Sequence, residues 1–451
     1  MIMSQRSAHK WVDVRANERR VLIWSFLYFF SLLGGYYMLR PVRDALAVTA
    51  GRAHLSWMFT GTFVVMLLVA PLFGALVARF PRQRFVPWAY RFFLLNLVVF
   101  AALIHLDVAR VGVAYAYFIW LSVYNLFVVS VFWSVMADVF RNEQGKRLFG
   151  MISAGGTMGA LVGGWFTSTF AETLGLMGLL LLAAALLEGS VQCFFGATRA
   201  AREPARASDG APGSDSRALE RGEPAIIGGG VLAGVVQVLR SPYLAGICLY
   251  VVCMATVQTF LYIQRADIVA GAFATDEQRT GFFALLDVLV SLGTLLLQIL
   301  VTAPILRFLG VGAALAIMPV FSLAGVTGLA MMPVLSLLVV FESALRAANY
   351  ALGRPAREVL FTVVTREQKY KSKSFIDTVV YRFGDMTAGW AEYGLTALGL
   401  GLAGVAMVTA PLAVLWRGCA LALGQAQQAK AEAQPGNPER PAGGPASSTT
   451  A

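Results

Sequence analysis

Charged side chains interrupt several long apolar stretches of this chain, and they are the residues best equipped for chemistry. In hydrocarbon an ionisable side chain costs a few kcal/mol or more, so it needs a partner or a water-filled path. The arginines suit anion binding, because a guanidinium forms paired hydrogen bonds with phosphate or carboxylate oxygens. The candidate substrate-binding residues are Tyr36, Tyr37, Arg40, Arg43, Arg91, Asn125, Arg265, Arg346, Asn349, Tyr381 and Arg382.

Acidic residues in the same stretches suit coupling or gating, because a carboxylate pairs with an arginine or takes up a proton. Helical spacing places Glu342 beside Arg346 on one face, and Asp377 in line with Asp385 on another. The candidate coupling or gating residues are Asp44, Asp138, Glu188, Asp287, Glu342, Asp377 and Asp385.

A purely structural interpretation of these charges stays open. Arg40, Arg43 and Arg265 fall near predicted helix ends, where an arginine costs little because it reaches water or headgroups. Glu342 and Arg346 are also spaced for a salt bridge within one helix. On this interpretation the arginines hold helices in place and bind nothing.

The elements that carry these residues are predicted to be membrane-spanning helices. The chain has 451 residues, of which 58% are hydrophobic and 14% charged, whereas soluble domains are about a quarter charged. Runs of about 20 apolar residues span a bilayer as helices, and Pro41 predicts an end or kink of the first one. We expect an all-α integral membrane protein with twelve spans, at 21–39, 55–78, 85–106, 112–136, 148–170, 174–196, 243–263, 281–301, 310–331, 334–352, 375–393 and 396–416.

The net charge of +11 is distributed as membrane topology requires. With the N-terminus inside, 27 of the 36 Lys and Arg fall in inner loops and in the two tails. This asymmetry follows the positive-inside rule and places both termini in the cytoplasm. We therefore expect the lipid bilayer as a partner and no nucleic acid.

The sequence offers no pattern for catalysis, a metal or a cofactor. The four cysteines form no CxxC pair and the three histidines are isolated. The Gly145-Lys146-Arg147 triplet lacks the upstream glycine and the hydroxyl of a phosphate-binding loop. The chain is therefore not predicted to be an enzyme.

The sequence divides into two similar halves. Glu143-Gln144 and Glu367-Gln368 occupy corresponding loops, and six predicted helices lie on each side of a polar segment rich in Ala, Pro and charge. Duplicated six-helix halves with a long central loop describe the architecture of major facilitator transporters. The predicted parts are an inner N-terminal segment at 1–20, bundles at 21–198 and 241–420, a linker at 199–240 and a disordered inner tail at 421–451.

A glycine ladder marks the fifth predicted helix. Gly155, Gly159 and Gly163 recur every fourth residue, so they share one helical face. Small residues let two membrane helices approach until their backbones touch, and the closer van der Waals packing stabilises the helix pair. The ladder predicts a packing face and not a binding site.

Several segments resemble the ATP:ADP antiporter family, the nucleotide translocases, and especially its shorter bacterial relatives. The resemblance rests on the sequences that begin at Tyr36, Val131, Glu143 and Leu239, namely YYMLRPVRD, VFWSVMAD, EQGKRLFG and LRSPY. It implies exchange of ATP, ADP or another small phosphorylated anion across the bacterial inner membrane, with Arg40 and Arg43 in the pathway.

Three hypotheses remain open from the sequence. The first is a monomeric secondary transporter that exchanges nucleotides or other phosphorylated anions by rocker-switch alternating access. The second is a proton-coupled major facilitator exporter of organic or amphipathic solutes, which would use Glu188, Asp287 or Asp377 as protonation sites. The third is a non-transporting assembly or sensor protein that acts through the linker.

Overall fold

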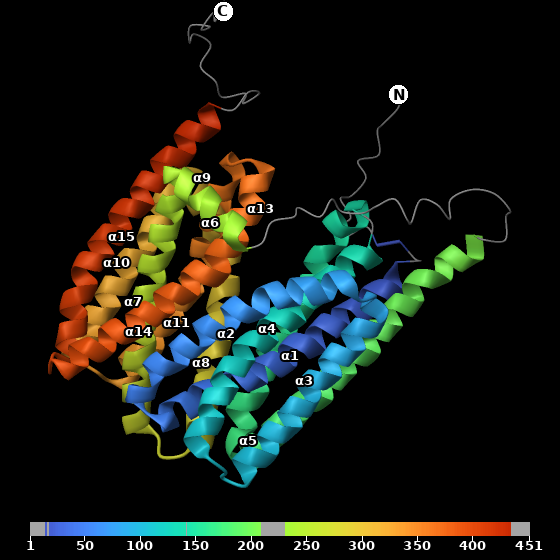
Figure 1. Ribbon diagram of the computed structural model, residues 1–451, viewed down its shortest axis with the longest axis horizontal. Coiled ribbons are helices and arrows are strands. Elements are labelled where there is room, and N and C mark those ends of the chain that lie inside the picture. Colours follow the sequence, from blue (N-terminus) through green and yellow to red (C-terminus); the bar gives the residue numbers. More distant parts are fainter. Residues whose placement is uncertain (1–13, 16–17, 141, 209–230, 434–451) are drawn as a thin grey trace, which may run out of the picture. The chain divides into compact units, whose positions relative to one another are not determined.

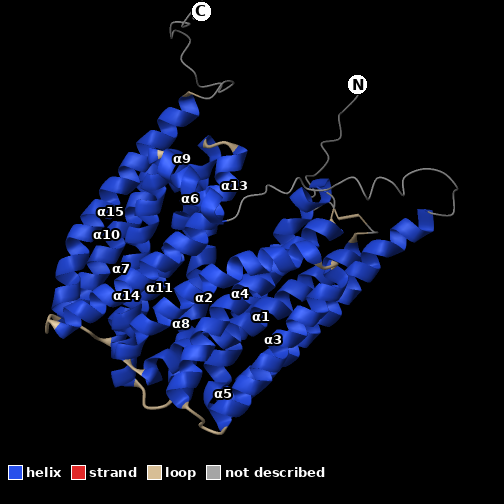
Figure 2. Ribbon diagram, viewed as in Figure 1, coloured by secondary structure: helices blue, strands red, loops and turns tan. Residues whose placement is uncertain are grey.

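Every described element of the chain is helical in the computed structural model, which describes residues 14–15, 18–140, 142–208 and 231–433 (Figure 2). Apolar segments in lipid must satisfy their backbone groups internally, and a helix does so within one segment. The helices are α1 (Arg19–Ala50), α2 (Arg52–Arg79), α3 (Arg82–His105), α4 (Arg110–Val139), α5 (Asn142–Ser208), α6 (Val231–Arg240), α7 (Pro242–Ala272), α8 (Asp276–Leu297), α9 (Ala303–Phe308), α10 (Gly310–Met331), α11 (Leu335–Ala348), α12 (Arg354–Leu360), α13 (Arg366–Phe375), α14 (Tyr381–Ala397) and α15 (Gly401–Glu432). π-Helical turns occupy Gln298–Thr302, Asn349–Gly353 and Ile376–Val380, and Phe361–Val363 is a 3₁₀ turn.

The prediction of an all-α membrane protein is confirmed. Among the described residues, ten helices are long and apolar enough to cross a bilayer. One of them, α5, holds two predicted spans, because its backbone leaves the helical conformation at Gly175 (φ 66°, ψ 171°), which only a glycine adopts easily. The eleventh predicted span corresponds to α14, which has 17 residues and is not among the ten. The number twelve is reached only when α5 is counted twice and α14 is added.

The chain divides into two compact units. One comprises residues 1–226 and 266–291, and the other comprises 227–265 and 292–451. The first therefore contains α1 to α5 together with the end of α7 and the first part of α8. The second contains α6, most of α7 and the elements from the end of α8 to α15, with α10 packed against α15 (Figure 1). The division of the chain at 199–240 stays a prediction.

The glycine ladder lies against α1 in the first unit. A Cβ atom added at Gly155 would lie 2.6 Å from the carbonyl oxygen of Phe26. Added Cβ atoms at Gly159 and Gly163 would collide with the carbonyl oxygens of Phe30 and Gly34 in the same way. The two helices thus meet along a seam with a period of four residues, and this seam positions the polar side chains of α1.

Aromatic side chains fill the rest of the core of the first unit. The hydroxyl groups of Tyr28 on α1 and Tyr90 on α3 lie 2.8 Å apart, and Tyr90 donates to the carbonyl oxygen of Val128 at 3.1 Å. Phe132 of α4 packs edge-on against Tyr28 with ring centroids 4.9 Å apart. Buried hydroxyls are thereby satisfied inside an apolar core, as lipid-embedded polar groups must be.

Three boundaries differ from those predicted. Pro41 neither ends nor breaks α1, which continues for nine further residues to Ala50. The segments predicted as linker and tail begin as helix, because α5 continues to Ser208 and α15 to Glu432. Ala, Gln, Lys and Glu dominate the last turns of α15, and these residues favour a helix even without tertiary contacts. Residues 209–230 and 434–451 lie outside the described part of the chain.

Filling the seam should destabilise the first unit. Gly159→Leu places a side chain where a backbone carbonyl lies, so we expect a loss of about 1–3 kcal/mol or more, seen as a lower unfolding temperature of the detergent-purified protein. Gly150→Leu is the matched control, because a Cβ at Gly150 meets nothing within 4 Å. An unchanged unfolding temperature for Gly159→Leu would contradict the close packing of α1 and α5.

Candidate functional site

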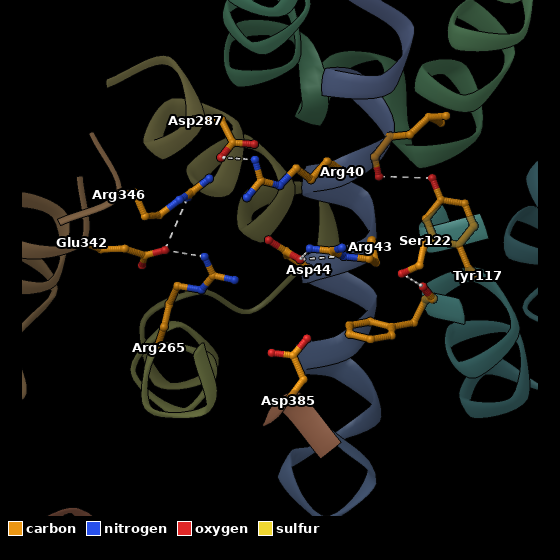
Figure 3. A network of polar contacts seen from close by, with 12 residues as sticks. Arg40, Arg43, Asp44, Tyr117, Ser122, Arg265, Asp287, Glu342, Arg346 and Asp385 are labelled. Atoms are coloured by element: carbon orange, nitrogen blue, oxygen red, sulfur yellow. Dashed lines mark hydrogen bonds and ion pairs between the residues drawn. The ribbon is translucent and has the colours of Figure 1, made fainter. Parts of the chain in front are cut away.

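Two arginines of α1 lie well inside the helix, each paired with a carboxylate (Figure 3). Arg40 lies 3.5 Å from Asp287 of α8, a residue of the same compact unit. Arg43 donates from Nε and Nη2 to Asp44 at 2.9 and 2.7 Å. Because α1 extends to Ala50, Arg40 and Arg43 precede its end by ten and seven residues, about 15 and 10 Å at 1.5 Å per residue. The predicted end of the first helix near these residues is therefore wrong, because α1 continues past them to Ala50.

Aromatic rings accompany Arg40. The rings of Tyr36 and Tyr37 meet at 84° with centroids 5.6 Å apart. The Arg40 guanidinium lies 6.0 Å from the Tyr37 ring, within range of a cation–π interaction. Asn125 of α4 is half-buried in the same unit. This part of α1 therefore presents a guanidinium beside an aromatic surface.

In the second unit, one carboxylate serves two arginines (Figure 3). Glu342 of α11 accepts hydrogen bonds on the same oxygen, Oε1, from Arg265 of α7 at 2.5 Å and from Arg346 at 3.4 Å. Its other oxygen, Oε2, is buried and has no hydrogen-bond partner among the described residues. The side chains of Arg265, Glu342 and Arg346 are 5%, 13% and 16% exposed. Two guanidinium groups thus converge at one carboxylate oxygen of the second unit.

A second polar cluster of the same unit joins α7 to α14. Asp385 accepts from the Thr259 hydroxyl and from Arg382 Nη1, both at 3.1 Å. One turn earlier on α14, the Tyr381 hydroxyl donates at 3.2 Å to Gln258, the residue directly before Thr259. Thr259 was not singled out from the sequence, since a lone threonine in an apolar helix usually bonds to its own backbone.

Asp377 and Asp385 have different surroundings. Asp377 lies in the π-helical turn Ile376–Val380, pairs with Arg357 at 3.4 Å and has a side chain 36% exposed. The Asp385 side chain is 9% exposed. Their common helix face stays a prediction. Asn349 begins another π-helical turn and is half-buried.

Arg91 and Glu188 are brought together, but on an exposed face of the first unit. Arg91 Nε and Nη2 donate to the two Glu188 oxygens at 3.2 and 2.9 Å. Their side chains are 52% and 34% exposed, far more than those of the other paired arginines of α1, α7 and α11. Asp138, in the last turn of α4, is exposed as well.

A network that sequence reasoning missed holds the turn between α7 and α8. Asp276 is buried, and it accepts hydrogen bonds from Thr49, from Arg110 at 2.7 Å and from Arg279 at 3.2 Å. Asp267 near the end of α7 pairs with Arg52 of α2. In sequence these charges look like ordinary outer-loop residues, and nothing in their spacing distinguishes them.

Comparisons with known proteins show the fold. No family model matches the chain, and neither does any curated protein, so the resemblance to the ATP:ADP antiporters stays a prediction. A bacterial homologue of the human lysosomal transporter Spinster covers 93% of this chain and 99% of its own, with a TM-score of 0.59 at 14% identity. The nucleoside transporter NupG covers 92% and 99% with a TM-score of 0.60 at 12% identity. A bacterial homologue of the iron transporter ferroportin covers 88% and 99% with a TM-score of 0.61 at 13% identity. The chain therefore has the major facilitator-like fold of these transporters.

One of the resembling motifs is tied to the start of α1. Glu18, directly before α1, is buried and accepts from Arg147 at 2.7 Å, from Gln144 at 3.0 Å and from the Arg15 backbone N–H at 3.1 Å. Burial raises the pKa of Glu18, but the hydrogen bonds from Gln144 and Arg15 and the charge of Arg147 outweigh it, so the pKa lies below its ordinary value. The motif thus anchors α1 to the first turns of α5.

This anchor should depend on pH. Because the folded-state pKa of Glu18 is lowered, its contribution to stability is present above the ordinary glutamate value of 4.5 and disappears as pH falls through the folded-state pKa. We expect Glu18→Gln to unfold at a lower temperature than the wild type at pH 7, and the difference to shrink below about pH 4.5. The exposed Glu143→Gln is the control. A difference that stays constant with pH would exclude the ionised anchor.

Proposed function

We propose that the protein is a secondary transporter of small phosphate-bearing organic anions, with nucleotides as the first class to test, and that it works by alternating access. The fold supports transport, because the similar solved structures are transporters of several unlike solutes. That diversity leaves the solute to be argued from the side chains of this chain.

The observation that carries the anion proposal is the shared carboxylate of the second unit. Arg265 and Arg346 both donate to Glu342 Oε1, and the three side chains are at most 16% exposed. Two guanidinium groups that converge at one oxygen form a site of concentrated positive charge. An entering phosphate or carboxylate group would compete with Glu342 for the N–H donors of both arginines.

The first unit also contains an arginine that an anion could bind, Arg40 on α1. Arg40 is held by Asp287 at 3.5 Å, longer than a charge-assisted hydrogen bond of about 2.7–2.9 Å. An anion that competes with Asp287 would gain a shorter bond to the guanidinium. The neighbouring Tyr36 and Tyr37 offer ring faces for a planar base, which is why nucleotides come first among phosphate-bearing solutes.

Transport by alternating access also needs contacts that break and re-form. The network of Asp276 with Thr49, Arg110 and Arg279 ties α8 to the ends of α1 and α4. In the proposed cycle this network is intact in one state and broken in another.

Removing Arg346 should impair anion exchange. In liposomes preloaded with ATP or ADP, we expect Arg346→Ala to lower the initial rate of labelled-nucleotide counterflow by about tenfold or more, since hydrogen bonds to charged groups contribute about 1.5–3 kcal/mol. Arg307→Ala is the control, because Arg307 is exposed on α9.

The variant Glu342→Gln distinguishes a role of Glu342 in substrate binding from a purely structural role. It removes the charge that competes with the substrate while it keeps the side-chain volume, so the apparent affinity for the anion should rise. Correctly oriented wild-type protein that exchanges no nucleotide, sugar phosphate or other phosphorylated anion would overturn the proposal.

A proton-coupled transporter is the second candidate, supported by the position of Asp385. This carboxylate accepts from Thr259 on α7 and Arg382 on α14, so protonation would weaken a contact between two helices. We expect Asp385→Asn to abolish uptake driven by a pH gradient while exchange at equal pH persists. If a pH gradient drives no flux in the wild type, proton coupling is excluded and simple exchange remains.

A further inference from the structure

An ion pair lies on the exposed surface of α3 and the later part of α5, which form an edge of the first unit (Figure 1). Arg91 and Glu188 make two hydrogen bonds, and Gln192 donates to Glu188 Oε1 at 2.7 Å. A guanidinium carries five N–H donors, so two bonds to Glu188 do not exhaust it. The group therefore keeps hydrogen-bonding capacity that faces outward.

The pair lies at the depth of the hydrocarbon core. Arg91 is 14 residues before the end of α3 at His105, and Glu188 is 13 residues after the break at Gly175. Each distance is about 20 Å along its helix at 1.5 Å per residue, within a hydrocarbon core of about 30 Å. Arg91 also lies nine residues after Arg82, about 14 Å from the other end of α3. Neither charge reaches the headgroups easily.

Apolar side chains surround the pair on the same face. Trp88, Phe92 and Leu95 of α3 are 79%, 60% and 59% exposed. Leu181 and Phe195 of α5 lie on the exposed stripe that also carries Glu188. Such a surface belongs against lipid or another membrane helix, and a half-exposed ion pair in lipid is costly.

Small residues leave a notch beside the pair. Ala185 and Gly189 are four residues apart on α5, the spacing with which small residues admit a second helix. A Cβ added at Gly189 would meet nothing within 4 Å, whereas the ladder glycines of α5 are closely covered by α1. No described residue of this chain fills the notch at Gly189.

We propose that this α3–α5 face, comprising Trp88, Arg91, Leu95, Ala185, Glu188 and Gly189, is the interface with a second copy of the chain. The pair is self-complementary: a two-fold axis along the membrane normal brings Arg91 of each copy toward the partner's Glu188. Each guanidinium would then lie between two carboxylates, and four alternating charges would be shielded from lipid. The transporter is thus a dimer, in contrast to the monomer expected from sequence.

The chemistry of the face favours a second copy over a lipid headgroup. The pair is electrically neutral, so it does not select an anionic headgroup, and it lies about 14–20 Å from the helix ends. A protein partner at that depth needs both an acceptor for Arg91 and a small face opposite Gly189. The same face of another copy provides both.

The test is dimerisation of the full chain in liposomes, measured by counting photobleaching steps over a dilution series. Gly189→Leu fills the notch without touching the monomer core, and we expect the dimer dissociation constant to rise about tenfold or more. Arg91→Met with Glu188→Met removes the charges while it keeps an apolar contact within the chain, which usually preserves folding. We expect the same loss of dimer.

Gly418→Leu is the matched control, since Gly418 is an exposed glycine of α15 with open space around it. It should dimerise like the wild type. A wild type that stays monomeric at every dilution overturns the proposal, as do both α3–α5 variants dimerising normally. If the wild type is monomeric and native mass spectrometry finds a lipid that the double Met variant loses, the face binds lipid instead. If the double variant does not fold, Gly189→Leu alone decides.

Discussion

Hydrocarbon offers a charged side chain neither hydrogen bonds nor screening, and the polar architecture of this protein depends on that constraint. Inside the helices each arginine of the candidate site lies against a carboxylate, as in Arg40 with Asp287 and Arg382 with Asp385. The partners come from different helices in several cases, so the pairs hold helices together as well as neutralising charge. In the proposed transport cycle a solute would bind by displacing one of these partners, and binding would thereby change helix contacts.

The quality of pairing distinguishes charges that hold the fold from charges available to a ligand. Arg43 makes two short hydrogen bonds to the Asp44 carboxylate, which neutralises much of its charge. Arg265 and Arg346, by contrast, share one oxygen of Glu342, and their side chains are 5% and 16% exposed. Burial matters as much as distance, because solvent-exposed ion pairs are weak and buried ones are costly unless completed.

Packing supplies the rigidity that these charges require. The contact of Gly159 and Gly163 with backbone carbonyls of α1 leaves no room for the helices to slide, since interiors are close-packed. This packing fixes the positions of the Arg40 and Arg43 guanidinium groups relative to α5. Where small residues remain uncovered, as at Gly189, the same physics favours association with another helix.

The sequence by itself determined that the chain is an all-helical membrane protein, because hydrophobic run length and total charge are local properties that lipid constrains directly. Helix ends were less predictable. Pro41 does not stop α1, since packed membrane helices tolerate proline when neighbouring groups satisfy the freed carbonyl. The π-helical turn at Ile376–Val380 adds a residue to one turn directly before α14, and a spacing rule of 3.6 residues cannot anticipate it.

Only the tertiary structure decided which charges meet. Arg91 and Glu188 are 97 residues apart in sequence, and each looked like a single insertion into its own helix. Composition and periodicity report which side chains share a helix face, but pairing depends on how helices rotate and slide against one another. That rotation is set by side-chain packing over whole helices, here by the seam that includes Gly159, and it is not encoded in any one segment.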